Sequence, residues 1–268
     1  MNIFDSKYVY PVVSRRAGGL SLVINLNTNN ACNWQCIYCE IPNLTRGGPE
    51  PIDIDLLKDE LNFWIDQIIN SSFIQDNTPP DTTFADVALS GNGEPTAAPE
   101  SLNVLEIIID CLKEFNLIDK IPVRLITNGS FISKKKECLN IINQHHGEIW
   151  FKIDAADEDS IKRINQVNLD PNSMINHLKI CADACQTVIQ TCFLKINHQL
   201  PANDFLENYS RLIKPYEHIV KKIDFYSLAR PSLQNNQDIT IERLSLDELN
   251  NIKSILEKEL TIKIDVFP

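Results

Sequence analysis

The sequence predicts an α/β fold in which a parallel sheet curls into a full or partial barrel. Six short β-rich segments alternate with longer amphipathic segments, which is the pattern of strands joined by helical crossovers. Turn-forming and polar residues follow the first four of these strands and the sixth. Because barrels place their chemistry at the carboxyl ends of the strands, this arrangement favours an enzyme.

The first half of the chain supplies three strand–helix units. Its expected strands are short and apolar, and its expected helices carry apolar residues at helical spacing. The strands are expected at 21–26, 85–89 and 123–126, and the helices at 54–69, 102–115 and 134–144.

The second half repeats the pattern three more times. Strands are expected at 148–155, 187–195 and 222–228, helices at 158–165, 174–185, 204–213 and 246–259, and a short final strand at 261–266. Segments 70–83 and 231–240 look like loops within one domain. Residues 1–268 are therefore expected to form a single domain, with a core at about 18–230 and a helix and short strand within 241–268.

Composition narrows the class of protein. Hydrophobic residues make up 43 % and charged residues 23 % of the 268 residues, as in ordinary globular proteins. No apolar run approaches the roughly 20 residues that span a bilayer, and the N-terminus lacks the pattern of a secretory signal, so a cytoplasmic location is expected. The net charge of −11 disfavours a broad nucleic-acid surface but leaves room for a local basic groove.

Three cysteines directly follow the first strand in the segment CNWQCIYC. Cys32, Cys36 and Cys39 supply thiolates, which suit iron–sulfur clusters, and three of them leave one iron of a cubane cluster without a protein ligand. A zinc site is the alternative, but it would need a fourth ligand from elsewhere, and the sequence has no second close cysteine pair. The other five cysteines are read as small buried hydrophobes: Cys111, Cys138, Cys181, Cys185 and Cys192.

A glycine-rich turn follows the second strand in the segment GNGEPT. Gly91 and Gly93 let the backbone approach a ligand closely, and Glu94 offers a carboxylate to an ammonium group. Thr127 and Asn128 end the third strand, where they either hydrogen-bond a cosubstrate or turn the chain before a glycine.

Later strands carry further polar candidates. Alternation in the fourth strand puts Lys152 and Asp154 on the face opposite Phe151 and Ile153, and charges on a helix-packed face would be costly. The charged pair is therefore expected in the lumen, where it binds a ligand or forms a structural salt bridge. Gln190 in the fifth strand either reaches a ligand or is a satisfied core amide.

Two residues that end the sixth strand complete the set. Tyr226 and Arg230 are substrate-binding candidates, because a guanidinium group can clamp a carboxylate or phosphate. A surface ion pair is the alternative for Arg230. Arg163 and Asn165, after the fourth strand, are weaker candidates of the same kind.

The combination of these motifs resembles the radical S-adenosylmethionine (SAM) enzymes. The cysteine triad with Tyr38 before its last member, the SGNGEPT turn, Thr-Asn-Gly after the third strand and the Asp-Ala of the fourth look like the stand-alone iron–sulfur oxidoreductases related to wyosine-type tRNA-modifying enzymes. The resemblance covers roughly residues 18–230. It implies a partial (β/α)6 TIM-like barrel of the radical SAM type.

The resemblance also implies the cofactors and the residues that bind them. A [4Fe–4S] cluster would be held by Cys32, Cys36 and Cys39, and its open iron would chelate SAM. The residues expected to contact the bound cosubstrate are Tyr38, Gly91, Gly93, Glu94, Thr127, Asn128, Lys152, Asp154 and Gln190. The resemblance does not identify a catalytic residue.

The implied activity is reductive cleavage of SAM to a 5′-deoxyadenosyl radical that abstracts hydrogen from a substrate. Electrons would come from an external one-electron carrier of the flavodoxin or ferredoxin type. A peptide or small molecule is the favoured substrate, since the chain is acidic and shows no RNA-binding appendage. The alternatives are a tRNA-modifying enzyme, a glycyl-radical activase and a non-catalytic iron–sulfur electron-transfer or metal-binding protein.

Overall fold

The computed structural model describes residues 6–234 and 239–268 and confirms the predicted fold class. Within these residues the main sheet has eight strands in the order β1-β2-β5-β6-β7-β8-β10-β12. Neighbouring strands are parallel from β2 to β12, and β1 alone runs antiparallel to β2. The strands are β1 (Val9–Ser14), β2 (Gly19–Asn25), β5 (Phe84–Ser90), β6 (Val123–Thr127), β7 (Glu148–Lys152), β8 (Thr187–Cys192), β10 (Lys222–Tyr226) and β12 (Ile264–Phe267).

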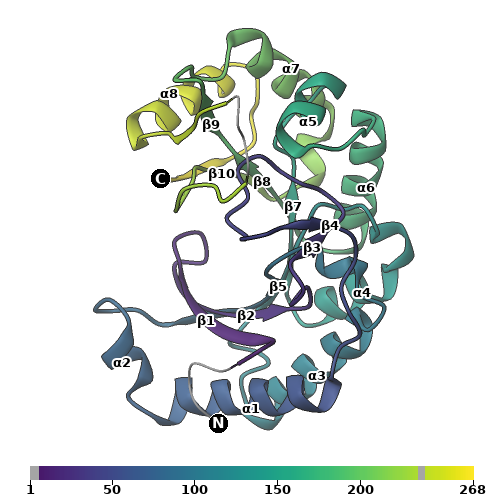
Figure 1. Cartoon of the computed structure of the whole chain (residues 1–268), viewed down its shortest axis with the longest axis vertical. Helices are drawn as coiled ribbons and strands as arrows, with labels where there is room; N and C mark the ends of the chain where they lie inside the picture. Colours follow the sequence, from purple (N-terminus) through teal and green to yellow (C-terminus); the bar gives the residue numbers. More distant parts are fainter. Residues whose placement is uncertain (1–5, 235–238) are drawn as a thin grey trace.

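Helices cover the outer face of this curved sheet. Figure 1 shows them as an outer arc, with the sheet inside it and the open side of the arc between the β1–β2 hairpin and the C-terminal strands. The helices are α1 (Ile54–Asn70), α2 (Phe73–Asn77), α3 (Ser101–Glu114), α4 (Lys136–Gln144), α5 (Glu158–Asn165), α6 (Pro171–Ala184), α7 (Asn203–Ile213) and α8 (Leu246–Leu256), with short 3-10 turns at Pro95–Ala97, Ile132–Lys134 and Lys214–Ile219. The sheet is therefore an incomplete barrel with an accessible lumen.

Two short ladders decorate the carboxyl edge of the sheet. β3 (Ala31–Cys32) pairs with β4 (Thr45–Arg46), and β9 (Leu194–Ile196) pairs with β11 (Ile241–Arg243). The first ladder gives shape to the loop that carries the three cysteines. Among helices formed by residues 6–234 and 239–268, none combines the length and apolar character needed to cross a bilayer.

Several predicted boundaries need correction. β1 was not expected, because Pro11 interrupts an otherwise β-rich run; an edge strand tolerates a proline, and β1 lies at the edge. The expected loop at 70–83 contains α2, and the expected strand at 187–195 is divided into β8 and β9. The ladder stops at Cys192 because its backbone N–H donates to the side chain of Asp154 rather than to a strand. Of the expected loop at 231–240, residues 235–238 lie outside the described residues.

The lumen face of the sheet carries a belt of paired polar groups. Ser21 donates to Asp86, Arg124 pairs with both Asp86 and Glu148, and Lys221 pairs with Glu148 at 2.6 Å. The opposite face of the same strands is apolar and packs under the helices, as the fully buried Ile149, Phe151 and Ile153 of the β7 segment illustrate. Charges on these strands thus lie opposite the helix-packed face and are paired across the strands.

A buried carboxylate on α1 anchors the edge strand. Glu60 is 1 % exposed and accepts backbone N–H groups from Lys7 at 2.7 Å, Tyr8 at 2.7 Å and Val9 at 3.0 Å. The carboxylate thereby satisfies three backbone donors at the start of β1. Hydrogen bonds to a charged acceptor are stronger than neutral ones, so this contact fixes where the hairpin starts.

Replacing Glu60 by Gln should loosen β1 selectively. The amide keeps one acceptor and turns an N–H donor toward backbone N–H groups, so we expect a loss of about 3 kcal/mol in the free energy of unfolding. Hydrogen exchange should show the loss of protection concentrated in residues 7–14. The matched control is Asp59→Asn, one residue earlier on the exposed face of α1, which should change stability little. Equal effects of the two substitutions would contradict the anchoring role.

Candidate functional site

The three motif cysteines line one cavity at the carboxyl ends of the strands. This cavity has a volume of about 190 Å³ and is bordered by Cys32, Cys36 and Cys39. These three cysteine residues are partly exposed, whereas the other five cysteines are buried, as expected for small core residues. The structure therefore separates the three cysteines of the cavity from five that pack in the core.

Two of the three cavity sulfurs accept an N–H donor. The Cys32 sulfur accepts the backbone N–H of Trp34 at 3.5 Å, and the Cys36 sulfur accepts the side-chain amide of Asn165 at 3.4 Å. Burial raises the pKa of Cys32 to about 11 and of Cys36 to about 12, while these donors lower both pKa values. Burial also raises the pKa of Cys39. The donors thus favour thiolate ligands, which a metal would have to create by displacing the protons.

The donor set fits an iron–sulfur cluster better than a single ion. Among residues 6–234 and 239–268, no three or more histidine, cysteine and carboxylate side chains are grouped closely enough to hold one metal ion. A cluster that takes one cysteine on each of three irons does not require the sulfurs to converge on a point. N–H groups directed at the sulfurs are the outer contacts that such clusters use.

The glycines of the second-strand turn serve packing against the cysteine loop. A Cβ atom at Gly93 would lie 2.3 Å from the backbone oxygen of Ala31 and 2.6 Å from the side chain of Asn27. Gly91 has a φ of +119°, and a Cβ there would lie 2.5 Å from Asn25 Oδ1. Both glycines also line the cysteine cavity. The turn that packs closely against the protein is thus the turn at which the sequence predicts the approach of a ligand.

Glu94 holds the ends of two strands together. Its carboxylate accepts Thr96 N at 3.1 Å, Thr96 Oγ1 at 2.5 Å, Thr127 Oγ1 at 2.7 Å and Asn128 N at 2.6 Å. Burial raises its pKa, and these hydrogen bonds oppose the rise. Three of these contacts fall on Oε1 and one on Oε2, so a lone pair of Oε2 has no partner among the described residues. These hydrogen bonds fix Thr127 and Asn128 at the end of β6, and the ammonium partner of Glu94 expected from the sequence stays a prediction.

Lys152 is the cation on the cavity wall. Its ammonium pairs with Asp154 Oδ1 at 2.9 Å and donates to the hydroxyl of Tyr226. Burial lowers the pKa of Lys152, but the adjacent Asp154 outweighs burial and the net pKa is raised, so the charge is retained. An ammonium group has three donors, and the partners among the described residues use two of them. The structural salt bridge between Lys152 and Asp154, which the sequence left as an alternative, is thus present. One N–H donor of Lys152 is left for a ligand in the cavity.

Two predicted cofactor residues lie behind this wall. Asp154 is 2 % exposed and, besides Lys152, accepts Tyr38 Oη at 2.5 Å, Asn165 Nδ2 at 2.9 Å and Cys192 N at 2.9 Å. Gln190 is fully buried, and its amide is bonded to Arg16 and Asp224. Neither residue lines the cysteine cavity, because its polar atoms are turned toward protein partners. The structure favours a positioning role for both over direct contact with a cofactor.

The remaining predicted residues divide between two places. The lining of the cysteine cavity includes Tyr38, Gly91, Gly93, Glu94, Thr127, Asn128, Lys152 and Tyr226. Arg230 instead pairs with Glu40 at 2.8 Å and its side chain is 78 % exposed, so the surface ion pair that the sequence left open is present. Beyond it, Ser232 Oγ donates to Ile37 O at 2.7 Å and Leu233 N donates to Cys39 O at 3.0 Å. Segment 230–234 therefore fastens the cysteine loop from outside.

Sequence reasoning missed or undervalued several contacts of the loop. Arg46 donates to the backbone oxygens of Asn33 and Gln166 at 2.9 and 2.7 Å, and Asn92 donates to Asn30 Oδ1 at 2.6 Å. Asn165, a weak candidate from the sequence, contacts a cysteine sulfur. Trp34 lines the cavity; its place between two motif cysteines was the one sequence signal for it.

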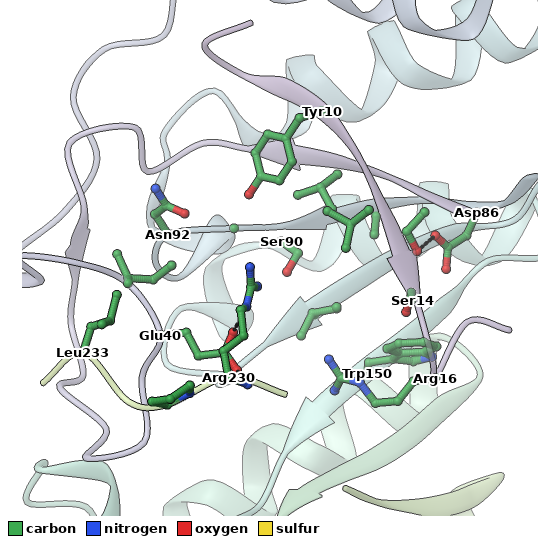
Figure 2. Close-up of a pocket in the computed structure, with 18 residues that line it drawn as sticks. Tyr10, Ser14, Arg16, Glu40, Asp86, Ser90, Asn92, Trp150, Arg230 and Leu233 are labelled. Carbon is green, nitrogen blue, oxygen red and sulfur yellow. Dashed lines mark hydrogen bonds and ion pairs between the residues drawn. The ribbon is translucent and has the colours of Figure 1, made fainter. Parts of the chain in front are cut away.

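A larger cavity adjoins the cysteine cavity inside the lumen. It has a volume of about 840 Å³, and both cavities are lined by Ile41, Ser90, Gly91, Asn92 and Ile126. Figure 2 shows Tyr10 at one side of it, Arg16 beside Trp150 at another, and Arg230 with Glu40 between Leu233 and Arg16. Its size is within the range of small-molecule sites.

Comparison with known proteins supports the fold. No family model matches the chain. The chain is 27 % identical over 264 residues to a protein named GTPase Obg from Brachyspira hyodysenteriae, covering 96 % of this chain and 34 % of that protein. It is also 27 % identical to a UPF0026 protein of Helicobacter pylori strain 26695, covering 89 % of this chain and 70 % of that protein. The chain thus spans about a third of the length of the first relative.

Solved structures with the same architecture are radical SAM proteins. A radical SAM methyltransferase from Sphaerobacter thermophilus superposes with a TM-score of 0.63 at 13 % identity, covering 92 % of this chain and 66 % of that one. TYW1 with a lysine-pyruvate adduct bound gives a TM-score of 0.59 at 18 % identity, covering 92 % and 75 %. Native anSMEcpe with bound AdoMet gives 0.56 at 15 % identity, covering 91 % and 63 %. The chain therefore has the partial-barrel fold of radical SAM enzymes.

Substitution of Gly93 by Ala should displace the cysteine loop. The added methyl group has no room beside Ala31 O and Asn27, so we expect a loss of about 2 kcal/mol in the free energy of unfolding together with a reduced yield of iron incorporation. Thermal unfolding and iron content of the anaerobically reconstituted protein measure the two effects. Gly48→Ala is the matched control on the same loop, because a Cβ there meets nothing within 4 Å. A Gly93→Ala protein as stable as this control would refute the packing argument.

Proposed function

We propose that this chain is a radical SAM enzyme. It would bind a [4Fe–4S] cluster through Cys32, Cys36 and Cys39 and cleave SAM reductively to a 5′-deoxyadenosyl radical, which abstracts hydrogen from a substrate. One observation carries the proposal: three partly exposed cysteines, two of whose sulfurs accept an N–H donor, border one cavity at the carboxyl ends of a partial barrel. A separate packing role would leave these cysteines buried like the other five.

The polar groups around the cavity support a SAM pocket. A carboxylate in the cavity would meet the remaining donor of Lys152, and an amino group would meet backbone carbonyl groups of the turn at 91–93. Tyr38 and Tyr226 flank the Lys152 ammonium, whose distances to their ring centroids are 5.1 and 4.6 Å, and they restrict water around it. An iron–sulfur protein that only transfers electrons needs no such pocket.

The neighbouring cavity supports a substrate site in the same lumen. It shares its wall at Gly91 and Asn92 with the cysteine cavity, so a bound substrate would lie next to the cosubstrate and away from bulk water. The anSMEcpe structure is described with AdoMet and with peptides, and TYW1 with a lysine-pyruvate adduct. A peptide or small molecule is the substrate class that we favour for this acidic chain.

The rest of the proposal concerns organisation and partners. We propose that the chain acts as a single radical SAM domain in the cytoplasm and receives electrons from a flavodoxin- or ferredoxin-type carrier. SAM is the proposed cosubstrate, and no membrane partner is proposed. A relation to the wyosine-type enzymes is supported by the TYW1 likeness in fold and by the motifs in the sequence.

Anaerobic reconstitution tests this proposal directly. The wild-type protein should incorporate about four iron atoms per chain and, with dithionite and SAM, release 5′-deoxyadenosine. Replacement of Cys32, Cys36 or Cys39 by Ala should lower both the iron content and the product at least tenfold, roughly the loss expected when a cluster ligand is removed. Cys111→Ala, which alters a buried cysteine that donates to Asn62, is the control and should retain both.

The proposal fails on either of two results. Wild-type protein that binds iron but releases no 5′-deoxyadenosine would be an electron carrier. Protein purified anaerobically with tightly bound zinc and without inorganic sulfide would be a zinc protein.

A further inference from the structure

Arg16 is a lumen cation without an anionic partner among the described residues. It lies in the turn between β1 and β2, which Figure 1 shows projecting into the open side of the arc. Its guanidinium donates to Gln190 Oε1 at 2.6 Å, and its central carbon lies 4.2 Å from the ring centroid of Tyr226 and 5.5 Å from that of Trp150. Within the part of the chain that the structure describes, no carboxylate forms an ion pair with it.

A buried relay fixes the position of this guanidinium. The other end of the Gln190 amide donates to Asp224 Oδ2 at 2.7 Å, and Asp224 pairs with Lys222 at 2.8 Å. Gln190 and Asp224 are both fully buried. Arg16 is thus held in one orientation from β8 and β10 although it belongs to the opposite end of the sheet. A guanidinium held in advance loses little freedom when it binds an anion.

The acidic groups on the cavity wall are already neutralised. Asp86 pairs with Arg124, and Glu40 pairs with Arg230. Arg16, which lines the same cavity, is the cation left over. Figure 2 shows Arg16 and Trp150 together at one side of the hollow, apart from the Glu40–Arg230 pair.

Positive charge accumulates further at the mouth of the lumen. A second cavity of about 350 Å³ is lined by Arg15 and Arg16 together with the Glu40–Arg230 ion pair, and it reaches Tyr38 and Cys39 of the cysteine loop. Burial lowers the pKa of Arg15, and the neighbouring guanidinium groups of Arg243 and Arg16 lower it further. In a chain with a net charge of −11, guanidinium groups crowded at one opening indicate a local site for negative charge.

We propose that the 840 Å³ cavity binds a small organic anion, a carboxylate or a phosphate ester, whose charged group pairs with Arg16. Apolar wall residues Val23, Ala88 and Ile126 would contact the body of this molecule, which extends toward the cysteine cavity. This inference rests on the proposed function, because the anion would be the substrate of the proposed radical SAM reaction. The cavity volume of about 840 Å³ and the net charge of −11 favour a small molecule over RNA.

Binding to the protein without reconstituted cluster tests the assignment. The probes are phenyl phosphate and benzoate, with benzyl alcohol and benzamide as their uncharged counterparts, measured by titration calorimetry. Wild-type protein should bind at least one anion more tightly than its neutral counterpart. Arg16→Met should weaken that binding at least tenfold, roughly the value of one charged hydrogen-bonded contact. The tighter of the two anions identifies the phosphate or the carboxylate as the preferred group.

Matched variants separate the local effect from charge and folding. Arg211→Met removes the same charge from an exposed position on α7 and should bind the probes like wild type. Arg16→Lys keeps the charge and should retain most of the binding that Arg16→Met loses. Thermal unfolding of each variant verifies that it is folded.

Four results would overturn the inference. They are equal binding of charged and neutral probes, no anion binding at millimolar concentration, equal losses in Arg16→Met and Arg211→Met, and Arg16-dependent binding of unfractionated tRNA in place of the small anions. Cleavage of SAM by the reconstituted wild-type protein is scored separately. Arg16-dependent anion binding without SAM cleavage would refute the proposed function alone, and SAM cleavage without anion binding would refute this inference alone.

Discussion

Two buried carboxylates at the strand ends determine the geometry of the whole site. Glu94 joins the end of β5 to the end of β6, and Asp154 joins the end of β7 to Cys192 at the end of β8. Each accepts four polar contacts and is 2 % exposed. A buried charge is costly unless it is fully satisfied, so these contacts form together or not at all. Parallel strands would otherwise be free to separate where their ladders end.

The cysteine loop depends on these same strand ends. Asp154 reaches it through Tyr38, and Asn165 connects Asp154 with the sulfur of Cys36. From the other side, Asn128 donates to Asn33 Oδ1 at 3.0 Å and Gly93 packs on Ala31. The loop has few strand contacts of its own, since β3 and β4 contain two residues each. Side-chain hydrogen bonds to the barrel replace the missing ladder and leave the thiols facing the cavity.

Sequence patterns predicted the features that depend on local chemistry. The cysteine triad, the order of strands and helices, and the lumen side of Lys152 followed from spacing and alternation, because each concerns residues close in the chain. Contacts that depend on the curvature of the sheet could not be predicted in this way. The hydrogen bonds of Glu94 with Thr127 and Asn128 were not predicted, because these two residues come from another strand. The contact of Arg16 with Gln190 joins residues 174 positions apart. Arg16 follows β1, a strand that is hard to predict from the sequence because it contains Pro11.

Local and distant contacts build different parts of the lumen: the proposed pocket for the cosubstrate and the proposed site for a second ligand. Residues near the cysteine loop come from adjacent strand ends and satisfy one another almost completely, which suits a pocket for a constant cosubstrate. The β1–β2 turn crosses the lumen to reach β8 and β10, and it adds a cation whose charge the described residues leave uncompensated. A surface turn accepts substitution more readily than a strand end that carries buried carboxylates. Selectivity for the second ligand can therefore change at this turn while the strand ends and the cysteine loop are preserved.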